Sequence, residues 1–275
     1  MAQAWIGISG WTYAPWRGVF YPADLPHRQE LEFVASRMNS VEINGSFYAL
    51  QRPSSFRDWF SRSPDDFVFA VKGGRFITHM KKLADVGTPL ANFFASGVLA
   101  LEHKLGPLLW QLPPSLGFDS GRLAAFFDRL PRTTGQAASL GEGHDNRLKH
   151  GAVTTAAVDR PLRHALEVRH PSFETRSFLD LLRDHDVGVV IADSAGRFPS
   201  FRDVTADFVY VRLHGAEELY VSGYTPQALD EWAGRCVSWL AAGLDVYVYF
   251  DNDVKVRAPF DAIGLIERIR AAETR

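Results

Sequence analysis

Val187-Gly-Val-Val-Ile-Ala-Asp193 is a short apolar run, rich in Val and Ile, that ends on a carboxylate. Further runs of the same kind recur along the chain, and longer segments with helical spacing of apolar residues lie between them. This alternation is typical of βα units around a parallel sheet. Besides Val187–Asp193, the predicted strands are Trp5–Ser9, Ser40–Asn44, Phe67–Lys72, Pro107–Leu112, His164–Arg169, Phe208–His214 and Val246–Asp251.

Helices are predicted between these strands, where apolar residues recur at positions i, i+3 and i+4. Pro53-Ser54, Asp119-Ser120 and Thr225-Pro226 supply capping residues or first-turn prolines. The stretch 194–204, which follows the sixth strand, has the composition of a loop. The predicted helices are Leu31–Met38, Ser54–Phe60, Leu99–Lys104, Leu123–Leu130, Phe178–His185, Pro226–Leu240 and Pro259–Ile269.

Eight predicted strands in 275 residues favour an α/β fold, a (β/α)₈ TIM-type barrel in a single domain over residues 1–275. A doubly wound open sheet is the competing architecture. It is disfavoured because no glycine-rich phosphate fingerprint follows the first strand. Residues 73–98 and 131–163 stand apart from the βα pattern, and the second is expected to be a lid or an irregular insertion.

Composition excludes several classes of protein. A net charge of -2 argues against charge-driven binding of nucleic acid over the whole surface. The single cysteine, Cys236, rules out an intrachain disulfide and a cysteine metal cluster. Trp232, Cys236 and Trp239 share one helical face, so we expect core packing there. No run approaches the roughly 18 apolar residues of a membrane span and no signal peptide is recognisable, which predicts a cytoplasmic protein without a membrane partner.

Polar residues close nearly every predicted strand in the phase that points into a barrel. Residues at the C-terminal strand ends line the active site of such folds. A buried charge without a partner is costly, so these groups need either a function or one another. The alternative to a functional site is therefore a buried ion-pair network that only fills the barrel. The groups are Glu42, Asn44, Lys72, Gln111, Glu167, Arg169, Asp193, Arg212 and His214, with His170 at a corner and Asp251, Asn252 and Asp253 after the last strand.

The chain carries a series of short motifs, each at one position and spread over nearly its whole length. They are Ile8-Ser9-Gly10-Trp11-Thr12-Tyr13 with Trp16 and Phe20-Tyr21-Pro22, Val41-Glu42-Ile43-Asn44 with Ser46-Phe47-Tyr48, Phe69-Ala70-Val71-Lys72 with Thr78-His79, Leu105-Gly106 with Gln111-Leu112-Pro113-Pro114-Ser115, Glu167-Val168-Arg169-His170, Val211-Arg212-Leu213-His214-Gly215 and Tyr249-Phe250-Asp251-Asn252. In order and spacing they resemble the bacterial and archaeal domain of unknown function 72 family, also called YecE-like, from residue 5 to about residue 263.

The resemblance implies a TIM-barrel-like fold and supplies no reaction. One departure from the family pattern is Asp251, a carboxylate where the family usually carries an asparagine. The segment 131–163 also looks longer than the usual connection. What the resemblance implies for the eighth strand and for this segment is therefore open.

The residue types favour an enzyme or ligand-binding barrel with a cation-rich pocket for an anionic, phosphate- or carboxylate-bearing substrate. Guanidinium and ammonium groups hold such anions, and carboxylates and histidines carry out acid/base chemistry. Glu42, Glu167 and His214 are the predicted catalytic residues. No metal and no other cofactor is expected. The predicted substrate-binding residues are Trp11, Asn44, Tyr48, Lys72, Arg75, His79, Gln111, Arg169, His170, Arg212, Asp251 and Asn252.

Two other functions stay open at this stage. A divalent-metal barrel resembling the sugar isomerase and apurinic endonuclease group would use carboxylate and histidine ligands, although the inward cations count against it. A non-catalytic module for a nucleotide or nucleic-acid fragment would stack bases on aromatic rings while arginines meet phosphates. The candidate metal ligands are Glu42, Glu167, Asp193, His214 and Asp251. We further expect Glu42, Lys72, Glu167, Arg169, Arg212 and His214 to converge on one pocket.

Overall fold

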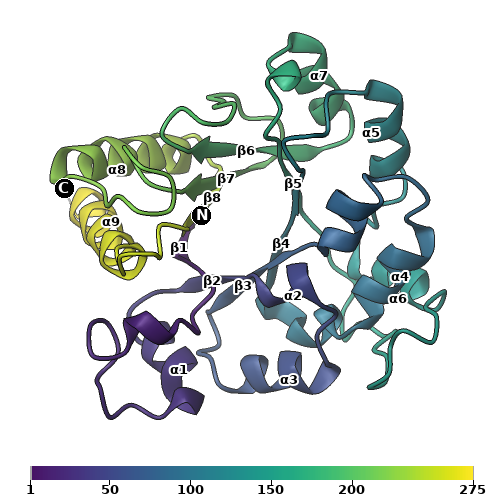
Figure 1. The fold of residues 1–275 in the computed structure, drawn as a ribbon, viewed down its shortest axis with the longest axis horizontal. Coiled ribbons are helices and arrows are strands. Elements are labelled where there is room, and N and C mark those ends of the chain that lie inside the picture. Colours follow the sequence, from purple (N-terminus) through teal and green to yellow (C-terminus); the bar gives the residue numbers. More distant parts are fainter. Residues whose placement is uncertain (1, 275) are drawn as a thin grey trace. The chain divides into compact units, whose positions relative to one another are not determined.

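The computed structural model of the protein describes residues 2–274. These residues contain eight β-strands, which close into a barrel in chain order from β1 to β8 (Figure 1). The predicted fold class is confirmed, and every predicted strand ends within two residues of an observed one. The strands are β1 (Ala4–Ser9), β2 (Ser40–Ile43), β3 (Val68–Lys72), β4 (Leu105–Gln111), β5 (His164–Glu167), β6 (Val187–Asp193), β7 (Phe208–Leu213) and β8 (Asp245–Phe250).

Helices occupy the connections between the strands. Two of the predicted helix starts are confirmed by side-chain caps, because Asp119 accepts a hydrogen bond from the backbone N–H of Arg122 and Thr225 from that of Ala228. The α-helices are α1 (Glu30–Ala35), α2 (Gly45–Tyr48), α3 (Pro53–Ser61), α4 (Gly87–Ala95), α5 (Ser120–Phe127), α6 (Thr134–Gly141), α7 (Arg176–Asp184), α8 (Pro226–Ala241) and α9 (Ala258–Glu273). Shorter helical turns are η1 (Ala14–Trp16), η2 (His27–Gln29), η3 (Phe76–Met80), η4 (Val98–Lys104) and η5 (Pro171–Phe173). Among the described residues no helix is long and apolar enough to cross a bilayer.

The chain divides into two compact units, a terminal unit of Met1–Glu42 with Gly188–Arg275 and a central unit of Ile43–Val187. Within the terminal unit β6, β7, β8, β1 and β2 pair in parallel in that order. Within the central unit β3, β4 and β5 pair in parallel. In each unit the C-terminal ends of the paired strands therefore lie along one edge.

In the terminal unit α8 and α9 lie side by side and pack against β8, and α9 also packs against β1 (Figure 1). The apolar face of α8 supplies Leu229, Trp232 and Cys236 to this contact. Cys236 is fully buried, and burial raises the pKa of its thiol to about 12. The prediction that Cys236 is a packing residue is therefore confirmed.

In the central unit the packing of α4 against α6 places two helices where the sequence did not predict them. Helix α4 lies in the stretch 73–98, and its residues from Leu90 to Ala95 are all buried. Helix α6 lies in the stretch 131–163, where Thr133 caps its first turn and the Thr134 N–H donates to the Arg160 carbonyl at 2.9 Å. The first part of the expected insertion is thus regular structure, and a lid role for the remainder stays a prediction.

A buried polar pair connects β4 and β5. The Trp110 indole N–H donates to Nδ1 of His164 at 3.1 Å, and Nε2 of His164 lies 2.7 Å from the carbonyl oxygen of Pro131. An indole nitrogen can only donate, so Nδ1 accepts and Nε2 carries the proton. His164 is fully buried, and burial lowers its pKa to about 4. The imidazole is therefore a neutral structural group with a fixed tautomer.

Gly73, directly after β3, is needed for a close approach of backbone to core. A Cβ atom built on Gly73 would lie 2.3 Å from the Trp110 indole, well inside van der Waals contact. The Gly73 N–H meanwhile donates to the Leu109 carbonyl at 2.8 Å. The loop that carries Arg75 and His79 therefore begins directly against the indole.

Candidate functional site

Several of the predicted polar residues lie at C-terminal strand ends. Lys72, Gln111, Glu167 and Asp193 are the last residues of β3, β4, β5 and β6. Two groups of side chains result, one in each unit. We call them the Glu42 cluster (Ser9, Glu42, Tyr210, Arg212, His214 and Asp251, terminal unit) and the cationic cluster (Lys72, Arg75, His79, Gln111, Glu167 and Arg169, central unit). That both serve one pocket stays a prediction.

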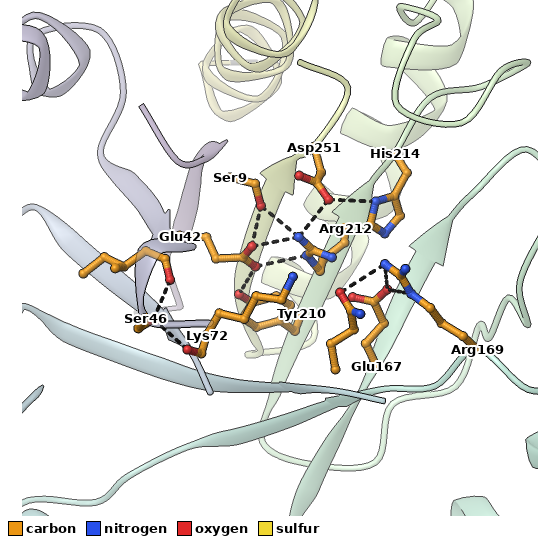
Figure 2. A network of polar contacts seen from close by, with 12 residues as sticks. Ser9, Glu42, Ser46, Lys72, Glu167, Arg169, Tyr210, Arg212, His214 and Asp251 are labelled. Atoms are coloured by element: carbon orange, nitrogen blue, oxygen red, sulfur yellow. Dashed lines mark hydrogen bonds and ion pairs between the residues drawn. The ribbon is translucent and has the colours of Figure 1, made fainter. Parts of the chain in front are cut away.

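In the Glu42 cluster a carboxylate and a guanidinium form a fully buried bidentate pair. Arg212 Nε lies 3.1 Å from Oε2 of Glu42 and Nη2 lies 2.8 Å from Oε1, and both side chains have no exposed area. Ser9 donates to Oε1 and the Tyr210 hydroxyl donates to Oε2 at 2.7 Å (Figure 2). Each oxygen of Glu42 thus accepts two hydrogen bonds from the described residues, which is all that a carboxylate oxygen ordinarily accepts. These bonds favour Glu42 as a group that holds Arg212 in place.

Tyr210 stays a donor in this cluster because burial, with the Glu42 charge beside it, raises the pKa of its hydroxyl far above the ordinary value. Tyr210 lies two residues before Arg212 on the same predicted strand, so both side chains point to the same face. This alternation could have identified Tyr210. Ser9 is the last residue of the first predicted strand, Trp5–Ser9, so its position was a signal as well. Both residues were missing from the predicted site.

Asp251 connects Arg212 to His214. Its Oδ2 lies 2.9 Å from Nη2 of Arg212 and 3.1 Å from Nδ1 of His214 (Figure 2). The Asp251 side chain is 13% exposed, whereas Arg212 and His214 are fully buried. A carboxylate that orients an imidazole through Nδ1 is the usual arrangement of a proton-transferring histidine.

The residues after Asp251 differ in orientation, which sequence parity had left undecided. The Asn252 amide donates to the Asp261 carboxylate at 2.8 Å and to the Ser222 carbonyl at 2.9 Å. Asp253 contacts the Tyr13 hydroxyl, and burial together with the Asp251 charge raises the pKa of Asp253 to about 6. Asn252 therefore fastens the loop after β8, while Asp253 adds a carboxyl group near Asp251.

In the cationic cluster Arg169 is turned back onto the end of its own strand (Figure 2). Nε and Nη2 of Arg169 lie 3.0 and 2.9 Å from Oε1 of Glu167, and Nη2 lies 3.1 Å from Oε1 of Gln111. Glu167 is almost fully buried, while the Arg169 side chain is 12% exposed. The guanidinium thus donates to Glu167 and Gln111 and still reaches solvent.

Lys72 and His79 lie on the ring of Phe47. Nζ of Lys72 is 4.5 Å from the ring centroid, and the imidazole of His79 packs edge-on at 5.1 Å. Helix α2, which carries Phe47, is tied to β3 because Oγ of Ser46 lies 2.6 Å from the Lys72 carbonyl. The π-helical turn η3 carries His79, and such turns often occur at functional sites.

The charges of the cationic cluster shift the pKa of the His79 imidazole. Burial, together with the positive charges of Lys72, Arg169 and Arg75, lowers the pKa of His79 to about 4 against the opposing effect of Glu167. The imidazole is therefore neutral at neutral pH. A single side chain thus lies in the field of several cations, which is the field an anion would enter.

The other predicted binding residues have varied positions. Tyr48 is 68% exposed, and the Arg75 guanidinium carbon lies 5.8 Å from its ring centroid. His170 caps η5 by accepting from the Ser172 N–H at 3.2 Å. Asn44 precedes α2, and its Oδ1 is buried with no hydrogen-bond partner in residues 2–274. Trp11 is half-buried and its carbonyl accepts from the Tyr21 hydroxyl at 2.5 Å.

The carboxylate and histidine positions bear on the metal alternative. In the part of the chain that the structure describes, no group of three or more His, Cys, Asp and Glu side chains is placed to hold a metal ion. The candidate ligands Glu42 and Asp251 instead accept hydrogen bonds from Arg212. The metal-dependent alternative therefore has no ligand set among these residues.

Comparison with known proteins identifies relatives of unassigned function. UPF0759 protein YecE of Escherichia coli O157:H7 is 26% identical over 196 residues, 69% of this chain and 59% of that protein. UPF0759 protein YunF of Bacillus subtilis is 27% identical over 115 residues, 40% of each chain. This chain thus spans about three fifths or less of the length of these relatives.

Solved structures agree with the fold. A DUF72 family protein of Thermotoga maritima is similar with a TM-score of 0.77 and 25% identity, over 98% of this chain and 99% of that one. A DUF72 family protein of Enterococcus faecalis has a TM-score of 0.74 at 16% identity, over 98% and 96% of the two chains, and shows the fold alone. The sequence profile described as "Protein of unknown function DUF72" matches residues 5–275. The resemblance in the strand-end motifs is thereby confirmed, and the chain belongs to the DUF72 family.

Proposed function

We propose that the chain is an enzyme that binds a phosphate- or carboxylate-bearing substrate at the cationic cluster and acts on it by acid/base chemistry. The observation that carries the proposal is the common field of Lys72, Arg75 and Arg169 at His79, opposed by Glu167. Cations gathered at strand ends stabilise an anion through charge-assisted hydrogen bonds. The partly exposed Arg169 would supply a planar pair of donors and Lys72 a point charge.

The acid/base roles follow from the contacts of each carboxylate. Glu167 contacts Arg169 through Oε1, and we assign it proton transfer at the bound anion. His214, oriented by Asp251, is the proton carrier of the terminal unit. Glu42 was expected to be an acid or base, and its filled hydrogen bonds instead favour a positioning role toward Arg212.

Titration with inorganic phosphate tests the anion site, with the His79 imidazole followed by NMR. Saturating phosphate is expected to raise the pKa of His79, because the bound anion offsets the neighbouring cations. Lys72→Met is expected to weaken phosphate binding about tenfold or more, the effect of one lost charge-assisted hydrogen bond.

The matched control is Arg57→Gln in α3, an exposed arginine whose charge is not among those that shift the pKa of His79. It should bind phosphate like the wild type. A His79 resonance that does not respond to phosphate, or equal weakening by both replacements, would refute the anion site.

Glu167→Gln distinguishes a functional carboxylate from a structural one. The amide keeps an oxygen for Arg169, and Arg169 has a second acceptor in Gln111 as well as contact with solvent. We therefore expect a loss of no more than about 1 kcal/mol in the free energy of unfolding, measured with urea. A loss of several kcal/mol would indicate that the cluster is a structural ion-pair network.

A further inference from the structure

We propose that the anion held by the cationic cluster carries an aromatic ring, and that this ring stacks on Tyr48. The inference rests on the anion site proposed above and names the chemical class of its ligand. That class is an aryl phosphate in the broad sense, a planar aromatic group joined to a phosphate.

Tyr48 is an exposed ring on a surface that is otherwise rigidly held. Tyr21, Tyr210 and Tyr249 are almost fully buried, whereas 68% of Tyr48 is exposed. Its neighbour Phe47 packs edge-on against it with centroids 5.1 Å apart. Because Ser46 ties α2 to β3, the backbone that carries Tyr48 is held against β3. An exposed ring on an anchored helix is a stacking platform that needs little backbone ordering when a ligand binds.

The Phe47 ring lies next to both the Tyr48 ring and the Lys72 ammonium group. The Phe47 centroid is 5.1 Å from that of Tyr48 and 4.5 Å from Nζ of Lys72. These two distances put the ammonium group no more than about 10 Å from the centre of the Tyr48 ring. An aromatic ring joined to a phosphate directly or through a short linker spans such a distance. The ligand therefore need not be a polymer.

Arg75 adds a second reason for an aromatic ligand. Its guanidinium lies 5.8 Å from the Tyr48 centroid, and its charge also acts on His79. A guanidinium attracts the face of a ring and binds phosphate oxygens, so Arg75 would contact both parts of such a ligand. A purely aliphatic anion would leave the Tyr48 ring in water. The joint placement of Tyr48 and Arg75 favours the aromatic class.

Calorimetric titration of the full chain tests this with inorganic phosphate, glycerol 3-phosphate and phenyl phosphate as probes. Phenyl phosphate is expected to bind about 5- to 100-fold more tightly than the other two, the usual effect of one stacked ring. Tyr48→Ala should remove this advantage without weakening inorganic phosphate. Tyr48→Phe, which keeps the ring, should retain most of it.

Val158→Ala is the matched control, since Val158 is 70% exposed and outside the cationic cluster, and it should leave all three affinities unchanged. If inorganic phosphate binds but phenyl phosphate gains nothing, or if the gain survives in Tyr48→Ala, the aromatic subsite is refuted and the anion site stands. If none of the three probes binds, the proposed function fails and this inference with it.

Discussion

Replacing Arg212 by methionine is expected to lower the free energy of unfolding by about 3–5 kcal/mol, the cost of leaving a buried charge without its partner. Arg212 donates to both oxygens of the fully buried Glu42 and also to Asp251. Methionine fills similar volume but donates nothing, so two carboxylates lose their cation. Urea unfolding of the variant measures the loss, and a change below 1 kcal/mol would contradict this role for Arg212.

A double-mutant cycle separates the pair from its surroundings. Glu42→Gln alone is expected to be strongly destabilising as well, because it leaves the Arg212 guanidinium buried against a neutral amide. The double replacement should cost less than the sum of the single ones, with a coupling free energy of about 1–3 kcal/mol. Simple additivity would show that Glu42 and Arg212 do not act as a unit. Arg268→Met, which breaks the exposed pair with Asp230, is the control and should cost less than about 1 kcal/mol.

Acidification is expected to destabilise the protein by about 3 kcal/mol between about pH 7 and pH 4 through His164 alone. The unfolded chain protonates this imidazole near pH 6.5, whereas burial lowers the pKa in the folded protein to about 4. Between these values the unfolded state binds more protons, so stability rises with pH in this window and falls as the pH is lowered. Protonation would also place a hydrogen on Nδ1, which accepts the hydrogen bond of the Trp110 indole in the neutral form.

NMR of the imidazole nitrogens checks this directly in the wild type. The Nε2-protonated tautomer of His164 should persist down to about pH 5, and titration near pH 6.5 in the folded protein would contradict the prediction. His79 has a lowered pKa and contributes in the same direction. Urea unfolding of His79→Gln at both ends of the window therefore removes the contribution of His79 from the measured change.

Short continuous or alternating apolar runs predicted the buried strands, and periodic apolar spacing predicted the helices that have one polar face. The continuous run Val187–Asp193 and the alternation in Phe208–His214 gave β6 and β7 almost to the residue. Helix α4 was not predicted because its residues from Leu90 to Ala95 are all buried, which leaves no exposed polar face in that part to reveal a helical period. Helix α6 escaped because its alanines, glycines and serine carry little hydrophobic contrast.

The alternation of side chains along a strand predicted which residues point inward, but not which of these residues form hydrogen bonds with one another. It named Glu42 and Arg212 correctly as inward residues, and gave no reason to expect four donors around one carboxylate. Partner choice depends on the register between strands, such as that which sets Ser9 beside Glu42, and register is not written in a single strand. The π-helical turn that carries His79 is likewise a tertiary outcome.

The indole behind Gly73 has a mechanical consequence for any ligand. With Trp110 in van der Waals contact and the Gly73 N–H bonded to Leu109, the root of the Arg75–His79 loop cannot retreat into the core. Movement of the loop is thus restricted on the side that faces the core. Trp110 therefore limits the mobility of this loop. A smaller residue at position 110 would make the loop more mobile, and a ligand would then have to order the loop on binding.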